Sequence, residues 1–115
     1  MQIMGVYAAL CVSDLDAATQ WYTRLLGRAP DHHPIETMVQ WLTPVGGIQL
    51  FREPERAGSG VMTIVTPDLT VTREELAAVG LDLGPETRGD FGAVAQIHDP
   101  DGNRITLAEP PGGSD

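Results

Sequence analysis

The sequence predicts an α+β fold in which a strand–helix–three-strand unit occurs twice. Residues 3–27 change from period-two alternation to helical spacing, which indicates a strand followed by a helix. The segment VSDL at 12–15 is echoed 54 positions later by TPDL at 66–69. A second echo, at nearly the same offset, links GIQL at 47–50 to RITL at 104–107. An internal repeat is the simplest account of both echoes.

The first unit begins with a strand over residues 3–12 and continues with a helix. Ser13 and Asp14 supply helix-capping oxygens, and Gly27 suits the left-handed residue that follows a helix. The helix between them is about thirteen residues long, an ordinary length. Three short strands are then expected, at about 28–33, 37–43 and 47–52.

The second unit repeats this order after a Pro- and Gly-rich linker. A strand over 61–66 leads to a helix near 71–79, where Thr72 and Glu75 have capping-box spacing and Gly80 ends the pattern. The remaining strands are predicted near 83–88, 92–98 and 103–109.

The stretch Asp99-Pro100-Asp101-Gly102 is a tight-turn signature between two apolar runs, so it predicts a hairpin between the last two strands. We therefore divide a single domain of residues 1–115 into four segments. These are module one at about 1–54, a linker at 55–60, module two at about 61–110, and a tail at 111–115 that we expect to be disordered.

Composition excludes several classes of protein. No run of apolar residues is long enough for a membrane span, and no secretory signal precedes the first strand, so we expect a cytoplasmic protein without a membrane partner. Cys11 is the only cysteine, which excludes an internal disulfide and a cysteine-based zinc cluster.

The formal net charge is −9, from seven basic and sixteen acidic residues. This charge repels phosphate backbones and disfavours nucleic acid as a partner. It is compatible with a cationic ligand. The alternative is an ordinary acidic surface, because most of the acids fall at caps, turns and helix faces.

The usual catalytic side chains form no recognisable set. His32 and His33 are adjacent, so on a strand they point to opposite sides and cannot chelate one ion together. His98 precedes the Asp99 turn and is interpreted as structural, with the mouth of a cleft as its alternative place. Cys11 has no basic neighbour in the sequence to activate it.

Three segments together resemble the vicinal oxygen chelate superfamily, which includes glyoxalase I, extradiol dioxygenases, fosfomycin-resistance enzymes and bleomycin-resistance proteins. They are VSDLDAATQWYTRLLG (12–27), GGIQLFREP (46–54) and DPDGNRITLAEP (99–110). The resemblance implies paired βαβββ modules whose curved sheets form a cleft. In this superfamily a second chain often completes the cleft, so a homodimer is expected.

The resemblance also implies where a metal would be bound, on the first, fourth, fifth and eighth strands. The corresponding residues here are Tyr7, Gln49, Val61 and Thr106. This set contains no carboxylate and no imidazole, which are the donors that catalytic divalent ions require. We therefore expect no metal at these positions and no cofactor.

Alternation along the strands predicts a concave face with small, aromatic and uncharged polar side chains, which suits a planar ligand. Trp41 and Phe91 are expected to join it from the third strand and from the loop before the seventh. For Trp41 and Phe51 the alternative is packing in the core or in a dimer interface. The strand residues expected on this face are Tyr7, Ala9, Cys11, Gln49, Phe51, Val61, Thr63, Val65, Arg104, Thr106 and Ala108.

These expectations favour a metal-free protein that sequesters an aromatic or cationic natural product, similar to the bleomycin-resistance branch. The alternative is an enzyme of the same superfamily, a lyase, isomerase or dioxygenase acting on an oxygen-rich small substrate. Such an enzyme needs either a metal site in another register or acid–base work by Tyr7 or His98. A third interpretation is a degenerate module with only a structural or partner-binding role.

Overall fold

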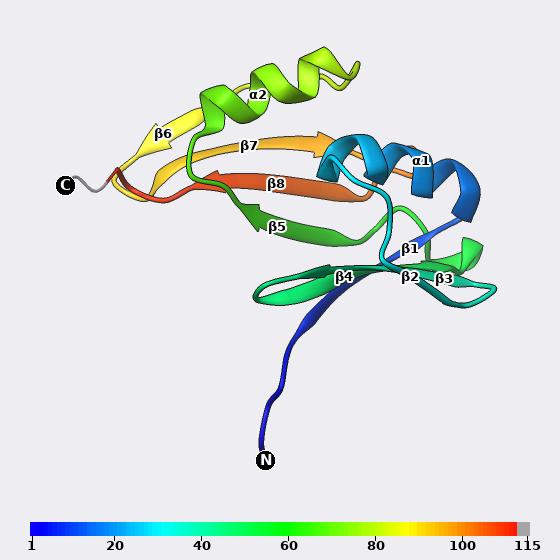
Figure 1. The fold of residues 1–115 in the computed structure, drawn as a ribbon. Coiled ribbons are helices and arrows are strands. Elements are labelled where there is room, and N and C mark those ends of the chain that lie inside the picture. The colour runs from blue at the N-terminus through cyan, green and yellow to red at the C-terminus, as the bar shows by residue number, and fades with distance from the viewer. Residues whose placement is uncertain (113–115) are drawn as a thin grey trace.

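The computed structural model describes residues 1–112 and contains two four-stranded mixed sheets, each with one helix on one face (Figure 1). The predicted α+β fold of two strand–helix–three-strand units is confirmed. Disorder of the tail was predicted for residues 111–115, of which 113–115 lie outside the described part of the chain.

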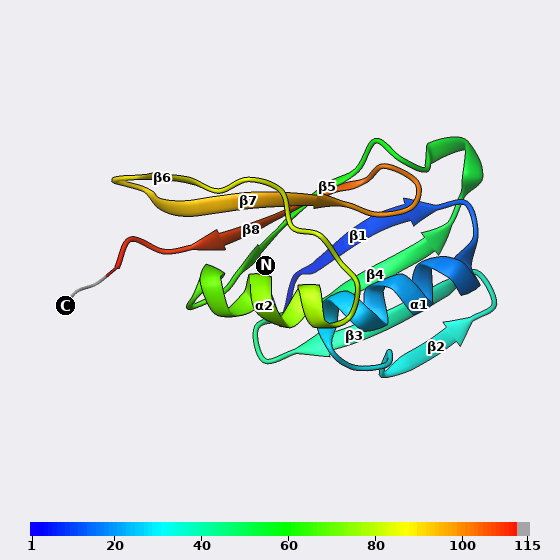
Figure 2. The same cartoon turned by 90° about the horizontal axis from the view of Figure 1, so that it is seen from above.

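The first module forms a sheet with strand order β1-β4-β3-β2, in which β1 runs parallel to β4 and the other neighbours are antiparallel. Seen from above, α1 lies across this sheet (Figure 2). The elements are β1 (Tyr7–Val12), α1 (Leu15–Leu26), β2 (His32–Ile35), β3 (Met38–Thr43) and β4 (Gly46–Arg52).

The second module has the equivalent order β5-β8-β7-β6, with β5 parallel to β8. A short 3-10 helix, η1 (Pro54–Arg56), precedes it where the sequence predicted a linker. Its elements are β5 (Val61–Val65), α2 (Leu69–Ala78), β6 (Thr87–Gly89), β7 (Gly92–His98) and β8 (Arg104–Glu109). Among the described residues, no helix is long and apolar enough to cross a membrane.

The two helices begin in the same way, which confirms the first sequence echo as a structural repeat. The side chain of Asp14 accepts a hydrogen bond from the amide of Ala17 at 3.0 Å, and that of Asp68 accepts one from Val71 at 3.1 Å. The predicted capping box in the second helix is wrong. Thr72 lies inside the first turn and donates its hydroxyl to the carbonyl of Asp68, so the helix begins at Leu69.

Strand boundaries differ from prediction where a partner strand is missing. The first strand begins at Tyr7 rather than at residue 3, because β4 offers a partner only from Gly47, which lies opposite Tyr7. Residues 1–6 extend away from the body of the molecule instead (Figure 1). The strands predicted at 28–33 and 83–88 lie later in the chain, as β2 and β6.

The predicted turn before β8 is confirmed, and it joins the two modules. The amide of Gly102 donates to the carbonyl of Asp99 at 2.9 Å, and Gly102 has the positive φ of +99° that glycine allows. The Asp99 carboxylate is buried and accepts the hydroxyl hydrogen of Tyr22 on α1 at 2.8 Å. Burial and this hydrogen bond raise the pKa of Tyr22 well above its ordinary value.

Asn103 completes the junction between the modules. Its side chain is fully buried, donates to the carbonyl of Cys11 at 2.9 Å, and accepts from the amides of Gly58 and Gly60 at 3.2 and 2.8 Å. One amide group therefore connects β1, the segment before β5, and the start of β8. Such a buried polar network fixes a geometry because every member has a partner.

Candidate functional site

Each sheet has one face without a helix, and we call these the two open faces (Figure 1). On the first sheet the register places Ala9 opposite Gln49, and Cys11 opposite Phe51. Residues paired in register point to the same side, so they share the open face. This face contains Tyr7, Ala9, Cys11, Met38, Gln40, Leu42, Gly47, Gln49 and Phe51.

The open face of the second sheet is built by the same rule. Thr63 lies opposite Thr106 on one side, and Gln96 lies opposite Thr106 on the other. Hydroxyl, amide and aliphatic groups make up most of this face, with one cation. It contains Val61, Thr63, Val65, Val94, Gln96, His98, Arg104, Thr106 and Ala108.

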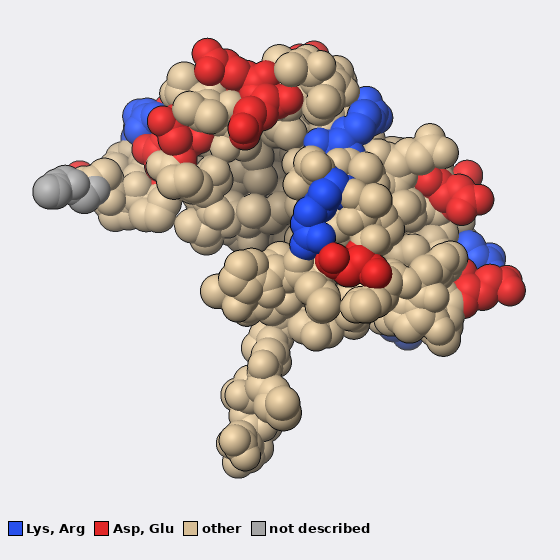
Figure 3. Space-filling model, viewed as in Figure 1, with Lys and Arg blue, Asp and Glu red and all other residues tan. Residues whose placement is uncertain are grey.

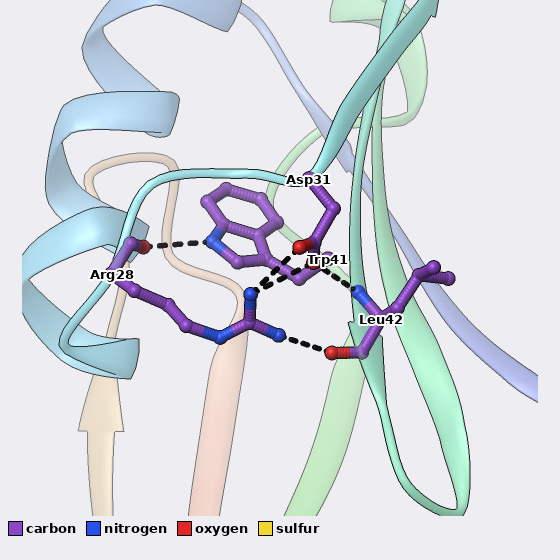
Figure 4. A network of polar contacts seen from close by, with 4 residues as sticks. All are labelled: Arg28, Asp31, Trp41 and Leu42. Atoms are coloured by element: carbon purple, nitrogen blue, oxygen red, sulfur yellow. Dashed lines mark hydrogen bonds and ion pairs between the residues drawn. The ribbon is translucent and has the colours of Figure 1, made fainter.

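Trp41 does not belong to either open face, contrary to the sequence-based expectation. It pairs with Ile48 on the helix side of the first sheet and is only 1% exposed. Its indole N–H donates to the carbonyl of Arg28 at 2.9 Å, just after α1 (Figure 4). The stated alternative of core packing therefore describes Trp41, because alternation along β3 sends it toward α1 and sends its neighbours outward.

The loop after α1 is tied to β3 around this tryptophan (Figure 4). Arg28 donates to the Asp31 carboxylate at 2.8 Å and also to the carbonyl of Leu42. Asp31 in turn accepts the amide hydrogen of Leu42 at 2.7 Å. The Arg28 side-chain hydrogen bond, followed by the Leu42 amide, lowers the pKa of Asp31 below its usual range.

Two aromatic rings lie over glycines on the open faces. A Cβ atom at Gly47 would lie 3.1 Å from Cδ1 of Tyr7, so only glycine leaves room for this ring. A Cβ atom at Gly89 would lie 2.5 Å from Cε2 of Phe91, which is 56% exposed at the β6–β7 turn. The glycines thus leave room for one flat surface at the rim of each open face.

Sequence reasoning missed two glutamines that neighbour the expected residues. Gln49 donates to the side-chain oxygen of Gln40 at 2.8 Å, and Gln96 donates to the hydroxyl oxygen of Thr106 at 3.3 Å. Gln40 and Gln96 lie on the strands β3 and β7, directly across from Gln49 and Thr106. The strand register, had it been predicted, would have identified both.

The four positions that correspond to the family's metal ligands fall into two pairs on separate sheets. Tyr7 lies opposite Gly47, two residues from the Ala9–Gln49 pair, and Val61 lies opposite Arg104. No cluster of three or more potential His, Cys, Asp or Glu ligands exists within residues 1–112. An aliphatic side chain beside a guanidinium is a poor environment for a divalent ion, so this donor set does not fit one.

The acidic residues lie off the open faces. Within the described part of the chain, no Asp or Glu occupies a strand position on either open face. On the side seen in Figure 3, acidic side chains gather over α2 and at the end of the molecule away from it. The net charge therefore gives no support to a cationic ligand on these faces.

Two hollows lie near the start of β1, and the first of them adjoins the open face of the first sheet. One, of about 810 Å³, lies between the N-terminal segment and the first sheet, where Met4, Tyr7, Leu42 and Val45 line it. The other, of about 490 Å³, lies where β1 and β4 approach β5. Both are wide open to solvent within a single chain, which leaves room for a covering element.

The other residues considered from the sequence are His32, His33 and Cys11, and none of them belongs to a recognisable site. His32 and His33 are exposed on β2, and His33 Nε2 lies 3.3 Å from the carbonyl oxygen of Glu36. Cys11 is half-buried on the same face as Tyr7. No catalytic arrangement of nucleophile and base involves these three residues among the described hydrogen bonds.

Two helix-backed sheets, each with one open face, define a fold class that hosts several activities rather than one. The sequence model of the Glyoxalase/Bleomycin resistance protein/Dioxygenase superfamily matches residues 6–107. The chain belongs to this superfamily. No curated protein matches the chain at a significant level.

Solved structures agree on the fold over nearly the whole chain. A glyoxalase/bleomycin resistance protein from Catenulispora acidiphila is 29% identical, with a TM-score of 0.86 over 95% of this chain and 100% of its own. TnmS3, an antibiotic-binding protein from Streptomyces sp. CB03234, is 24% identical, with a TM-score of 0.78 over 96% and 98%. Lactoylglutathione lyase from Agrobacterium tumefaciens is 19% identical, with a TM-score of 0.77 over 95% and 96%. The neighbours thus include both binders and an enzyme.

Proposed function

We propose that this protein is a metal-free small-molecule binder that sequesters an aromatic natural product on its open faces. The observation that carries the proposal is the chemistry at the family's metal positions, where Tyr7, Gln49, Val61 and Thr106 provide no carboxylate or imidazole. The rest of both faces offers flat rings, small side chains and uncharged hydrogen-bonding groups. These features favour retention of a planar ligand by shape and stacking.

A second copy of the chain is part of this proposal. Within one chain the open faces have no cover, and the N-terminal segment is mostly apolar, with Met4 98% exposed. Val61 and Val65 are also exposed on the open face of β5. Burial of these groups against another protomer would remove apolar surface from water and close the cleft. Sedimentation equilibrium would return the mass of a dimer, and a monomer at micromolar concentration would contradict this part.

Thermal shift against a panel of aromatic and glycopeptide antibiotics tests the binder function. A ligand present at one hundred times its Kd adds about 2.7 kcal/mol to the free energy of unfolding. Tyr7→Ala should abolish most of a positive shift, whereas Val71→Ala, an exposed change on α2 away from both open faces, should leave it intact. Recovery of the bound compound unaltered distinguishes sequestration from turnover.

The alternative is an enzyme of the superfamily, a lyase, isomerase or dioxygenase. The similarity in fold to a lactoylglutathione lyase supports this alternative. Metal content separates the two. Protein purified without chelators and then incubated with Ni²⁺, Mg²⁺, Zn²⁺ or Fe²⁺ should hold negligible metal. Near-stoichiometric metal that is lost in Gln49→Ala or Thr106→Ala would overturn the proposal and establish a metal site.

A further inference from the structure

Arg104 differs from most other basic residues of the chain. Within residues 1–112, the ion pairs involve only Arg28, Arg56 and Arg88. Two further arginines donate to backbone carbonyls. The guanidinium of Arg104 is exposed on the open face of the second sheet and has no carboxylate partner there.

The acids closest to Arg104 in sequence are already engaged elsewhere. The Asp99 carboxylate is buried against Tyr22 and Asn103. The Asp101 carboxylate accepts from the amide and hydroxyl of Ser13, in the first module. Both therefore point away from the open face, and a chain of net charge −9 keeps one uncompensated cation on it.

Polar side chains lie beside this cation on β7 and β8. His98 on β7 lies directly opposite Arg104 on β8, and cross-strand neighbours of this kind have Cβ atoms about 5 Å apart. Thr106 lies two residues along β8 on the same face, about 7 Å away. Because Gln96 donates to the hydroxyl oxygen of Thr106, the hydroxyl hydrogen is left for an outside acceptor. We call Arg104, Thr106, Gln96 and His98 the anion patch.

The backbone under the patch is paired on both sides, so the positions from which its side chains extend are fixed relative to one another. The amide of Arg104 donates to the carbonyl of Gly60 at 2.9 Å, and the strand is paired on both sides, to β5 and to β7. A guanidinium on a rigid strand can pair with a carboxylate through two parallel hydrogen bonds.

From this arrangement we propose that the ligand is an aromatic molecule with a carboxylate, and that the anion patch binds the carboxylate with Arg104 as its main partner. The inference rests on the proposed function and assigns the charge of its ligand. It reverses the sign suggested by the net charge, because within residues 1–112 no acid occupies a strand position of either open face.

The test uses three probes that share one ring and differ in charge: 1-pyrenecarboxylate, 1-pyrenecarboxamide and 1-pyrenemethylammonium. Binding is followed by fluorescence anisotropy at low and high salt. The wild-type protein should bind the carboxylate about tenfold more tightly than the amide and should bind the ammonium least, as expected for one charge-assisted pair. Added salt should weaken only the carboxylate complex.

Arg104→Gln should remove the advantage of the carboxylate and leave the amide complex unchanged. Arg56→Gln is the matched control, because it changes the net charge equally at an exposed residue of η1, and it should alter none of the three affinities. Melting temperature confirms that both variants fold.

The outcomes separate the two proposals. Equal binding of carboxylate and amide, tighter binding of the ammonium, or an unchanged preference in Arg104→Gln would overturn the anion patch and leave the binder function standing. Absence of binding by all three probes would overturn both, since the neutral amide tests the aromatic surface without any charge.

Discussion

The turn between β3 and β4 and the turn between β7 and β8 occupy equivalent places in the two modules but have opposite roles. The first, at residues 44–45, leaves Val45 91% exposed and bonds only locally, to Thr43. The second buries Asp99 and Asn103 and joins β1, α1 and the segment before β5. The same fold thus occurs twice, and the polar side chains of the second turn make the contact between the two modules.

The open faces of the two modules also differ, although their backbones are equivalent. The first combines the Tyr7 ring, Phe51 and a pair of glutamines, with no charged side chain at the positions of β1, β3 and β4 that belong to this face. The second replaces the aromatic residues of the strands by aliphatic and hydroxyl groups and adds Arg104. Equivalent backbones therefore present a stacking surface on one side and a donor surface on the other.

Removing the junction should have the largest effect on stability. Asn103→Ala leaves the carbonyl of Cys11 and the amides of Gly58 and Gly60 without their partner, at a cost of about 3 kcal/mol or more. Urea denaturation would measure this loss. Val45→Ala in the equivalent turn should change the free energy of unfolding by less than about 0.5 kcal/mol. Similar costs for the two substitutions would contradict the contrast between the turns.

Tyr22→Phe should cost less, about 1.5–3 kcal/mol, which is typical of a hydrogen bond to a charged group. It should also change the alkaline response. Because the pKa of Tyr22 is raised, the folded state keeps a proton that the unfolded state loses near its ordinary pKa of 10.0. The contribution is full below that pH and declines as pH rises above it. Thermal melts from pH 8 to 11 should show a steeper decline in the wild type than in Tyr22→Phe, and parallel curves would refute the assignment.

Gly47 and Gly89 lie under aromatic rings, and adding a methyl group at each compares the open faces directly. At Gly47 the new Cβ atom would meet the backbone oxygen of Trp41 at 2.9 Å as well as the Tyr7 ring, which costs about 1–3 kcal/mol. At Gly89 it would meet only the exposed Phe91 side chain, which can turn aside, so the cost should stay below about 1 kcal/mol. Melting temperatures of Gly47→Ala and Gly89→Ala provide the ranking, and a reversed order would show that Tyr7 is not held by Gly47.

The smallest effect on stability is expected at the Glu-Pro pair at the end of the same strand of each module, as Glu53-Pro54 and Glu109-Pro110. Glu109 accepts from the amide of Leu69 and pairs with Arg88, and these contacts lower its pKa, the amide more strongly. Its contribution is therefore present above the unfolded pKa of 4.5 and is lost as pH falls through the lower folded value. Glu109→Gln should flatten the loss of stability between pH 5 and 3. Glu53→Gln, whose side chain pairs only with the exposed Arg56, is the control and should leave that slope as it is.

Local signals in the sequence were sufficient for the repeated architecture. Asp14 and Asp68 cap helices, Gly27 ends one, and the Asp99–Gly102 turn forms as predicted, because each depends on the backbone of a few adjacent residues. The extended face of β1 was also predictable from alternation, with Tyr7, Ala9 and Cys11 on one side.

Strand limits and partners were decided only by the tertiary structure. The first strand is shorter than its apolar pattern because β4 offers no partner before Gly47, and Trp41 turns inward because α1 lies on that side of β3. The neighbours Gln40 and Gln96, and the lack of an acid at the described strand positions around Arg104, depend on register between strands distant in the chain. The sequence by itself determined which elements form, since those choices are local. The tertiary structure decided what each side chain faces, since pairing and helix placement join residues that no short stretch contains.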